Sequence, residues 1–383
     1  MPDAFIVDAV RTPIGKRGGS LAAEHPVDVS AHVLTSLVER AGIDPGIVED
    51  VIFGATDMVG PQAGDIARLS WLAAGLPQHV PGVTLDRQCG SSQQAVHFAA
   101  QAVMSGTQDV VVAGGVQMMS VIPINMAWSV GADLVHPDPF STSRTWQARY
   151  GKEELNQFRS ADMIAEKWDI GRAEMEQYAL SSHVRAATAV DEGRFEREIA
   201  PYAGLAQDEC FRRNTTLERM AGLKPLREGG LTTAAMASQI CDGAAALLVC
   251  SERALAEHGL TPRARVRAMS VRGDDPIFML TAPIPATRDV LRRSGLTIDD
   301  IDLVEVNEAF ASVVLAWQRE IGADPARLNV NGGAIALGHP IGASGARIMT
   351  SLLHELERTG GRLGLQTMCE GGGQANATII ERV

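Results

Sequence analysis

The sequence has no excess of positive charge. Its 383 residues include 34 Lys and Arg against 46 Asp and Glu, which gives a net charge of −12, and no run of basic residues offsets this balance. Proteins hold nucleic acid largely through basic contacts to its phosphates, so a chain of this charge is poorly suited to that task. We expect no nucleic-acid partner.

Long apolar segments are also missing. A helix needs about 18 consecutive apolar residues to span a bilayer, and no stretch of the sequence approaches that length. The first ten residues are too short and too acidic for a secretory signal and are typical of a first strand. With 45% hydrophobic residues the chain is not disordered. We therefore expect a cytoplasmic enzyme with no membrane partner.

The cysteines do not form pairs. Cys89, Cys210, Cys241, Cys250 and Cys369 are an odd number, widely separated, and none has the spacing of a Cys-x-x-Cys motif or of zinc ligands. Disulfides and a metal site are therefore not expected. Cys241 and Cys250 flank a continuous apolar run and are expected to be packing residues.

Glycine, by contrast, is abundant, with 38 residues. Five glycines fall within residues 331–345, and three more are consecutive at 371–373. Such clusters mark backbone that turns tightly or closely approaches another group.

Two parts of the sequence share one pattern. Residues 28–54 predict a helix opened by Asp28, a short turn and a strand, and residues 287–306 predict the same elements, with a helix over 289–294. Further along each copy, a Gly-x-Ser segment opens an apolar helix, near 94–104 and 346–356, and a strand follows. An internal duplication of an alternating βα unit explains this pattern.

Continuous apolar strands that alternate with helices predict an α/β fold with mostly parallel sheets covered on both faces. Residues 118–240 have no counterpart in the repeat, and we expect them to form an inserted domain or large lid. The first half then comprises residues 1–117 plus 241–261, and the second half comprises residues 262–383.

Cys89 stands where a strand leads into a helix. It follows the apolar segment 83–85 and is followed by Gly90 and two serines. A thiol at a helix amino end faces unpaired N–H groups and the positive end of the helix dipole, which favour a nucleophilic thiolate. The alternative is a small buried hydrophobe. The residues described next favour the nucleophile.

His339 lies in the glycine-rich segment 332–345, before Pro340, which biases the histidine towards extended backbone. The alternative is a buried structural histidine. The repeat places this loop in the second half where the Cys89 loop lies in the first. We therefore expect the two loops to face each other across a pseudo-twofold axis.

Two further side chains follow apolar strands. Cys369 precedes Glu370 and three glycines, so its thiol should emerge at a sheet edge beside N–H groups that can bind an oxyanion. Asn307 follows the strand 303–306, at the carboxyl end where α/β sites gather. The alternatives are a core cysteine and a turn-forming asparagine.

Together these residues meet the requirements of one chemistry. Making or breaking a carbon–carbon bond next to a thioester needs a covalent nucleophile, an acid/base group for the α-proton and two oxyanion sites. Cys89, Cys369, His339 with Asn307, and the glycine amides can fill these roles.

Four motifs, in the same order, resemble those of the thiolases, acyl-CoA:acetyl-CoA C-acyltransferases, over essentially the whole chain. They are the stretch around Cys89, the box Asn307-Glu-Ala-Phe310, the segment Asn331 to Arg347 and the sequence Cys369-x-Gly-Gly-Gly373. The resemblance implies a five-layered αβαβα core of two related halves with a loop domain. It also implies a homodimer or homotetramer that uses coenzyme A as a substrate and has no permanently bound cofactor.

The same resemblance implies roles for individual residues. Cys89 would be the acylated nucleophile, activated by His339, and Cys369 would exchange the α-proton of the acetyl-CoA unit. His339 and a water held by Asn307 would stabilise an enolate oxygen. The amides of Cys89 and Gly371 would form the second oxyanion site.

Residues of the insert are expected to bind the substrates. Ser238 matches a family serine that contacts the pantetheine arm, and Arg212 or Arg213 could meet a CoA phosphate. Phe158 stands where short-chain biosynthetic thiolases tend to carry methionine, which puts acetoacetyl-CoA in doubt. The segments 87–94 and 368–373 look similar to actinobacterial thiolases of steroid catabolism, so we expect a bulky or ring-derived 3-oxoacyl-CoA.

Alternative functions share parts of this pattern. A biosynthetic acetoacetyl-CoA thiolase and a non-catalytic lipid-carrier relative would both share the fold. A ketoacyl synthase would need a second histidine in place of Asn307, and a papain-like hydrolase would give Cys369 no role. The four candidate residues together favour the thiolase, acting in lipid or steroid degradation.

Overall fold

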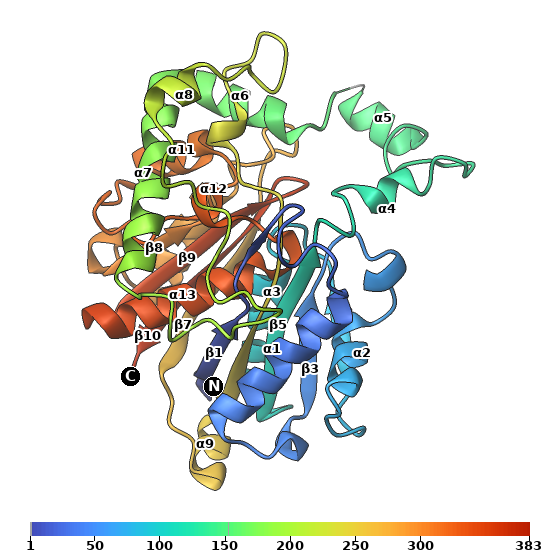
Figure 1. Cartoon of the computed structure of the whole chain (residues 1–383), viewed down its shortest axis with the longest axis vertical. Helices are drawn as coiled ribbons and strands as arrows, with labels where there is room; N and C mark the ends of the chain where they lie inside the picture. The colour runs from blue at the N-terminus through green and yellow to red at the C-terminus, as the bar shows by residue number, and fades with distance from the viewer. Residues whose placement is uncertain (1, 152) are drawn as a thin grey trace.

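The computed structural model describes residues 2–151 and 153–383, and its elements fall into three successive groups (Figure 1). The first group is β1 (Ala4–Arg11), β2 (Gly15–Lys16), α1 (Pro26–Ala41), β3 (Asp50–Gly54), α2 (Ile66–Ala73), β4 (Gly82–Leu85), α3 (Ser91–Ser105) and β5 (Val110–Met118). The second is α4 (Met126–Ser129), α5 (Arg144–Tyr150), α6 (Gln157–Lys167), α7 (Arg172–Asp191) and α8 (Leu217–Ala221). The third is β6 (Cys241–Ser251), α9 (Glu252–His258), β7 (Ala264–Gly273), α10 (Pro283–Ser294), β8 (Leu303–Val306), α11 (Ala311–Ile321), α12 (Ala334–Leu337), α13 (Ser344–Thr359), β9 (Leu363–Glu370) and β10 (Gln374–Arg382).

The strands form one continuous path in the order β4-β3-β5-β6-β1-β7-β10-β9-β8, and β2 pairs with β6. The two halves of this path join where Phe5 and Ile6 of β1 pair with Arg265 and Ala264 of β7. The expected duplication is visible in the pairing, because β3 lies parallel to β5 in the first half and β8 lies parallel to β9 in the second. The helices α3 and α13 are the corresponding crossovers.

The expectation of mostly parallel sheets is wrong. Among the described strands, only the pairs β3–β4, β3–β5 and β8–β9 are parallel, and the other pairs are antiparallel. The strand β6 returns after the insert to run against β1 and β5, and a tight glycine turn makes a hairpin of β9 and β10. Helices cover both faces of the sheet here, and strands buried on both faces are continuously apolar whether they pair in parallel or antiparallel. The apolar pattern therefore does not reveal the strand direction.

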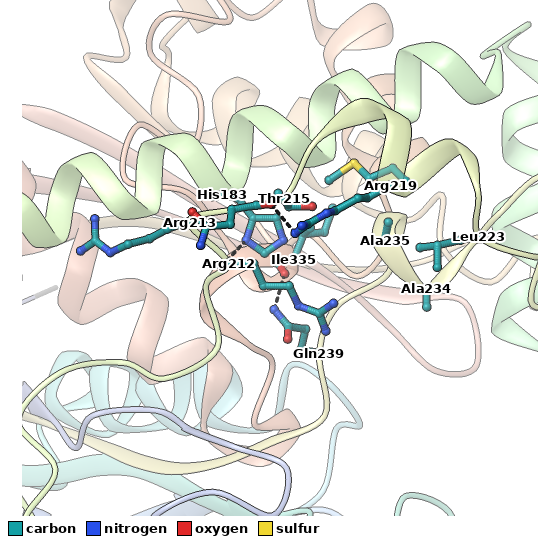
Figure 2. A pocket seen from close by; sticks show the side chains of 12 residues that line it. His183, Arg212, Arg213, Thr215, Arg219, Leu223, Ala234, Ala235, Gln239 and Ile335 are labelled. Carbon is teal, nitrogen blue, oxygen red and sulfur yellow. Dashed lines mark hydrogen bonds between the residues drawn. The ribbon is translucent and has the colours of Figure 1, made fainter.

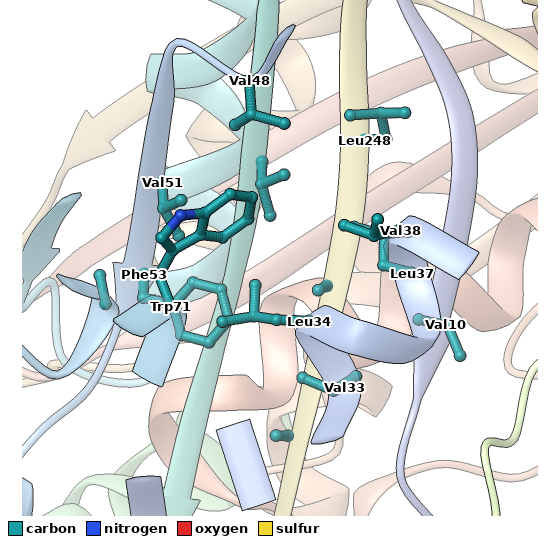
Figure 3. Packing of buried hydrophobic residues seen from close by; sticks show 14 of the residues in the cluster. Val10, Val33, Leu34, Leu37, Val38, Val48, Val51, Phe53, Trp71 and Leu248 are labelled. Atoms are coloured by element: carbon teal, nitrogen blue, oxygen red, sulfur yellow. The ribbon is translucent and has the colours of Figure 1, made fainter. Parts of the chain in front are cut away.

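Three apolar layers hold the fold together, which confirms the α/β class and the five-layered core. Figure 3 shows the first, in which Leu34 and Leu37 of α1 and Trp71 of α2 pack on Phe53 and Leu248. The second lies between α3 and α13 and takes side chains from strands of both halves. The third lies between the second half of the sheet and the helices α10 and α11. The layers therefore alternate as helix, sheet, helix, sheet, helix.

The ends of the repeated helices differ partly from expectation. Both helices end at a glycine in the left-handed conformation, Gly42 with φ 65° and Gly295 with φ 71°, as the sequence predicts. Their starts lie earlier than expected. The helix α1 begins at Pro26 after a His25 cap, and α10 begins at Pro283, so Asp289 lies inside the helix. Proline at the first helical turn, where no N–H partner is needed, explains both starts.

The elements between β5 and β6 extend away from the repeated core. The helices α6 and α7 pack against α11 of the second half, and α4 and α5 project from the body beside them (Figure 1). The division at residues 117/118, 240/241 and 261/262 stays a prediction. In the part of the chain that the structure describes, no helix is long and apolar enough to cross a membrane.

Candidate active site

Cys89 lies in a tight turn between β4 and α3, immediately before the helix cap Gly90. The turn is closed by Ser91, whose Oγ accepts a hydrogen bond from the Arg87 N–H at 2.9 Å and donates one to the Gln88 carbonyl at 2.6 Å. Gln88 has a φ of 50°, a left-handed conformation that is costly for a residue with a side chain. The turn therefore presents the half-buried thiol of Cys89 at the amino end of α3.

The sequence predicts a Cys89 that ionises easily, but the surroundings of Cys89 favour the protonated thiol. Burial, followed by the negative charge of Glu370, raises the pKa of Cys89 to about 12. Hydrogen bonds from the backbone of Cys89 and Gly371 act in the opposite direction but do not reverse the shift. The helix terminus alone does not ionise this thiol, so a nucleophilic Cys89 needs a base.

His339 is held in the state that such a base requires. Its Nδ1 lies 2.5 Å from the Ser344 Oγ, which itself donates to the Pro340 carbonyl at 2.9 Å. The Ser344 hydroxyl proton is already donated to Pro340, so the Ser344 oxygen can only accept a hydrogen bond from His339 Nδ1–H. The Nε2 atom of His339 therefore carries no proton and keeps its lone pair. Burial, with a smaller contribution from the Arg347 charge, lowers the pKa of His339 to about 3. The imidazole is therefore neutral at physiological pH.

Asn307 lies directly after β8 and points its amide nitrogen at His339. The distance from Asn307 Nδ2 to His339 Nε2 is 3.4 Å. The Asn307 Oδ1 is buried and has no hydrogen-bond partner among the described residues. A buried carbonyl oxygen without a partner is a natural place for a bound water.

Glu308 fixes the loop around these two residues and was missed in the sequence, although it stands in the same four-residue box. Its carboxylate accepts hydrogen bonds from the Tyr178 hydroxyl at 2.9 Å, the Ser182 hydroxyl at 2.7 Å and the Ile335 N–H at 3.0 Å. It thereby ties α7 of the insert to α12, which precedes His339. The sequence does not show this role, because the hydrogen-bond partners of Glu308 are distant from it in the chain.

Cys369 is the penultimate residue of β9 and is buried. Burial, followed by the charges of Cys89 and Glu370, raises its pKa well above the usual range. Glu370, the residue after Cys369, lies against Gly90, the residue after Cys89, so the segments that carry the two cysteines are neighbours in the fold. The expectation that these cysteines meet at one site, 280 positions apart in sequence, is consistent with this geometry.

One cavity, of about 570 Å³, opens at Cys89. Its lining includes Gly371, Ala309 two residues after Asn307, and Ile341 two residues after His339. Phe158 lies in the wall and packs edge-on against Phe310 with ring centroids 5.7 Å apart. The lining also includes four aromatic and three acidic residues, which are Trp128, Phe140, Trp146, Tyr150, Asp57, Asp86 and Asp274.

A second cavity, of about 360 Å³, lies against α12 and is lined by basic side chains (Figure 2). Arg212 and Arg219 lie at this cavity, and the Arg212 N–H donates to His183 Nδ1 at 3.1 Å. Arg213 also belongs to the lining, but its guanidinium is bound by Asp191 at 2.9 and 2.8 Å. Figure 2 shows the Arg213 side chain directed away from the others.

The structure thus separates the two arginines that the sequence left as alternatives, and it adds Arg219, which the sequence gave no reason to select. Ser238 does not belong to the described lining of either cavity. Its N–H donates to the Ala309 carbonyl at 3.0 Å, and its neighbour Gln239 lines the basic cavity. Ser238 therefore lies between the two cavities.

Comparison with known proteins agrees with the fold. The thiolase N-terminal domain matches residues 4–253, and the thiolase C-terminal domain matches residues 260–382. The chain is 60% identical to steroid 3-ketoacyl-CoA thiolase FadA6 of Mycobacterium tuberculosis, over 100% of this chain and 95% of that protein. It is 42% identical to the 3-oxoadipyl-CoA/3-oxo-5,6-dehydrosuberyl-CoA thiolase of Escherichia coli, over the whole of both chains.

A solved structure gives the same result. The crystal structure of the Bacillus anthracis acetyl-CoA acetyltransferase superposes with a TM-score of 0.87 and 37% identity, covering 100% of this chain and 99% of that one. Both domains, in order, account for nearly all residues. The chain therefore belongs to the thiolase family of acetyl-CoA C-acyltransferases.

Proposed function

We propose that this thiolase cleaves a bulky, steroid-derived 3-oxoacyl-CoA into acetyl-CoA and a shortened acyl-CoA. The observation that carries the proposal is the thiol of Cys89 at the amino end of α3, in the wall of one cavity with Gly371, two residues after Cys369, and Ile341, two residues after His339. The 60% identity to a steroid 3-ketoacyl-CoA thiolase supports the steroid origin of the substrate. The large aromatic cavity at Cys89 supports a bulky acyl group.

In the proposed first step, the Cys89 sulfur attacks the 3-keto carbon while the His339 Nε2 takes the thiol proton. The bond between C2 and C3 then breaks, and its electron pair passes to the acetyl-CoA enolate. Cys369 gives its proton to C2, which releases acetyl-CoA and leaves the acyl group on Cys89. The Cys369 thiolate then takes the proton of the CoA thiol, whose sulfur attacks this thioester and forms the shortened acyl-CoA. Cys89 leaves as a thiolate and takes its proton back from His339.

Two sites would carry the developing negative charge. The amides of Cys89 and Gly371 would stabilise the tetrahedral adduct, and the Gly371 backbone already lies within hydrogen-bonding reach of the Cys89 sulfur. His339 and a water on the unpartnered Asn307 Oδ1 would stabilise the enolate. A neutral His339 can first accept the Cys89 proton at Nε2. It can then donate a hydrogen bond from the same N–H to the enolate oxygen.

The CoA portion of the substrate would lie on the insert, residues 118–240. Arg212 and Arg219 would meet its phosphates in the basic cavity, whereas Asp191 already neutralises Arg213. Ser238, between the cavities, would contact the pantetheine arm. Residues 1–117 with 241–261, and residues 262–383, would form the two halves that meet at the reacting thioester. We further propose that the chain acts as a homodimer or homotetramer.

The proposal is tested by incubating the protein with a steroid-derived 3-oxoacyl-CoA in the absence of free CoA. We expect an acyl mass adduct on the peptide that contains Cys89, and no adduct in Cys89→Ala. Cys250→Ala, which removes a buried cysteine of β6 outside the site, is the matched control and should retain the adduct. An unmodified Cys89, with thiolysis surviving in Cys89→Ala, would refute the assignment. Turnover of acetoacetyl-CoA alone would instead favour the biosynthetic alternative.

A further inference from the structure

Glu370 is a buried carboxyl group next to both cysteines that the proposed mechanism does not use. It is the last residue of β9 and is paired in register with Gln374 of β10. Because neighbouring side chains of a strand point to opposite faces, Glu370 points away from the Cys369 side and towards α3. A methyl group on Gly90 would lie 1.8 Å from the Glu370 Oε1. The carboxyl therefore lies against the cap of α3.

The carboxyl group lacks hydrogen bonds in this position. Its side chain is 0% exposed, and neither Oε1 nor Oε2 has a hydrogen-bond partner among residues 2–151 and 153–383. A buried carboxylate without partners is costly, so this environment favours the protonated form. In keeping with this, burial raises the pKa of Glu370 to about 8, despite the opposing effect of the Arg87 charge.

The amino end of α3 is the feature that Glu370 and Cys89 share. The helix has 15 residues, and within the described structure no side chain caps its amino end. Its unpaired N–H groups and positive dipole end favour one negative charge at this place. Two negative charges there would repel each other, which is the effect that the Glu370 charge already has on the Cys89 thiol.

The other titratable groups near Glu370 do not provide an alternative partner. From the turn before α3, Arg87 donates its Nη1–H to Gln374 Oε1 at 3.1 Å, and its buried Nε has no hydrogen-bond partner among the described residues. The Arg87 charge lowers the pKa of Glu370 but does not reverse the effect of burial. On α3 itself, His97 is bound to Thr378 and Asn376 at 2.7 and 3.1 Å, and its pKa is lowered to about 3 by burial and by Arg87, so it is neutral.

The remaining nearby groups are acids. From β9, Cys369 is a buried thiol whose pKa is raised by burial and by the charges of Cys89 and Glu370. In the turn before α3, Asp86 adds a further charge that disfavours the Cys89 thiolate. Glu370 is thus the titratable group at the helix cap whose charge acts most strongly on Cys89.

We propose that Glu370 is a positioning residue that controls the nucleophilicity of Cys89 through their shared helix terminus. While the carboxyl group keeps its proton, the end of α3 can stabilise negative charge on Cys89. When the carboxyl group loses its proton, its own charge occupies that place and opposes the thiolate. This inference rests on the proposed role of Cys89 as the nucleophile.

The test is the pH dependence of Cys89 alkylation by iodoacetamide, followed on the Cys89 peptide by mass spectrometry in the intact protein. Glu370→Gln keeps the shape and removes the charge. We expect it to lower the pH midpoint of alkylation by about one unit or more, which is roughly tenfold faster modification between the pKa of Glu370 and that midpoint. At lower pH, where Glu370 is protonated in the native protein, the two rates should converge. Glu370→Asp, which keeps a carboxyl group but withdraws it from the cap, should give a smaller shift in the same direction.

Glu381→Gln is the matched control, because it removes a buried carboxylate from the far end of the same hairpin. It should leave the midpoint unchanged. A Glu370→Gln midpoint equal to that of the native protein would overturn the proposal. If Glu370→Gln does not fold, an unchanged midpoint in Glu370→Asp would overturn it in the same way. Failure of Cys89 to take an acyl group would refute the proposed function but would leave the alkylation shift in place.

Discussion

The cavity against α12 and the cavity at Cys89 differ sharply in charge. The cavity against α12 is lined by Arg212, Arg213 and Arg219, whereas the cavity at Cys89 is lined by Asp57, Asp86 and Asp274. In the described lining of the Cys89 cavity there is no lysine, arginine or histidine. A protein of net charge −12 can thus concentrate basic residues at one cavity, which is where the proposed function places the phosphates of CoA.

The contrast extends to how each wall is built. Arg213 is neutralised by Asp191, so the basic cavity retains Arg212 and Arg219 as its available cations. The cavity at Cys89 instead holds aromatic rings packed at a tilt, with the centroid of Trp146 4.5 Å from that of Tyr150 and 5.0 Å from that of Phe140. One cavity is suited to a charged group and the other to a large apolar group.

The largest effect is expected at His339, whose loop continues into the wall of the cavity at Cys89. His339→Asn removes the proton acceptor for Cys89, so the rate of Cys89 acylation should fall by about 10²- to 10⁴-fold. The measurement is single-turnover formation of the acyl adduct. His79→Asn, at an exposed surface site, should have no effect. An acylation rate in His339→Asn close to that of the native protein would show that another group takes the proton.

The basic cavity is tested by separating its arginines. Arg212→Ala should raise the KM for CoA about tenfold at low salt, because a charge-assisted contact to phosphate is lost. Arg213→Ala is the matched control and should change KM by less than about threefold, because it removes only an exposed ion pair. Equal effects of the two substitutions would contradict the distinction between these arginines.

The smallest effect is expected in the aromatic wall. Trp146→Ala should lower kcat/KM for a bulky 3-oxoacyl-CoA by about fivefold, the equivalent of about 1 kcal/mol of ring contact, and should leave acetoacetyl-CoA unaffected. Val135→Ala, an 88% exposed residue of the same projecting segment, is the control. The measurement is thiolysis over a series of acyl sizes. A uniform loss over the whole series would mean that Trp146 supports the segment and does not select the acyl group.

Much of the fold could be predicted because it depends on local signals. Gly42 and Gly295 end helices in both copies of the repeat, and the Gly-x-Ser segments after Cys89 and Ile341 open the paired helices α3 and α13. The parallel direction of the strands was predicted wrongly. The direction of β6 relative to β1 and β5 depends on the point at which the chain re-enters the sheet after the insert. The residues of β6 do not indicate that point.

The candidate site divides in the same way. Cys89, His339 and Cys369 stand in motifs that can be recognised in the sequence. The cavity at Cys89 is lined by Cys89 itself, by Ile341, two residues after His339, and by Gly371, two residues after Cys369, whereas the catalytic roles stay a prediction. The ionisation of Cys89 was predicted in the wrong direction, because the sequence shows the helix that follows but not the burial or the Glu370 charge beside it. Glu308 and Arg219 were missed because their partners are distant in the chain.

The sequence by itself determined the α/β class, the duplication, the thiolase motifs and the order in which the reactive side chains occur. These follow from periodicity and from short segments whose chemistry is local. Only the tertiary structure decided which arginines remain available, which acids surround Cys89 and which tautomer His339 adopts. Each of these depends on burial and on charges brought together from remote segments, because electrostatic effects act through space and are strongest where water is excluded.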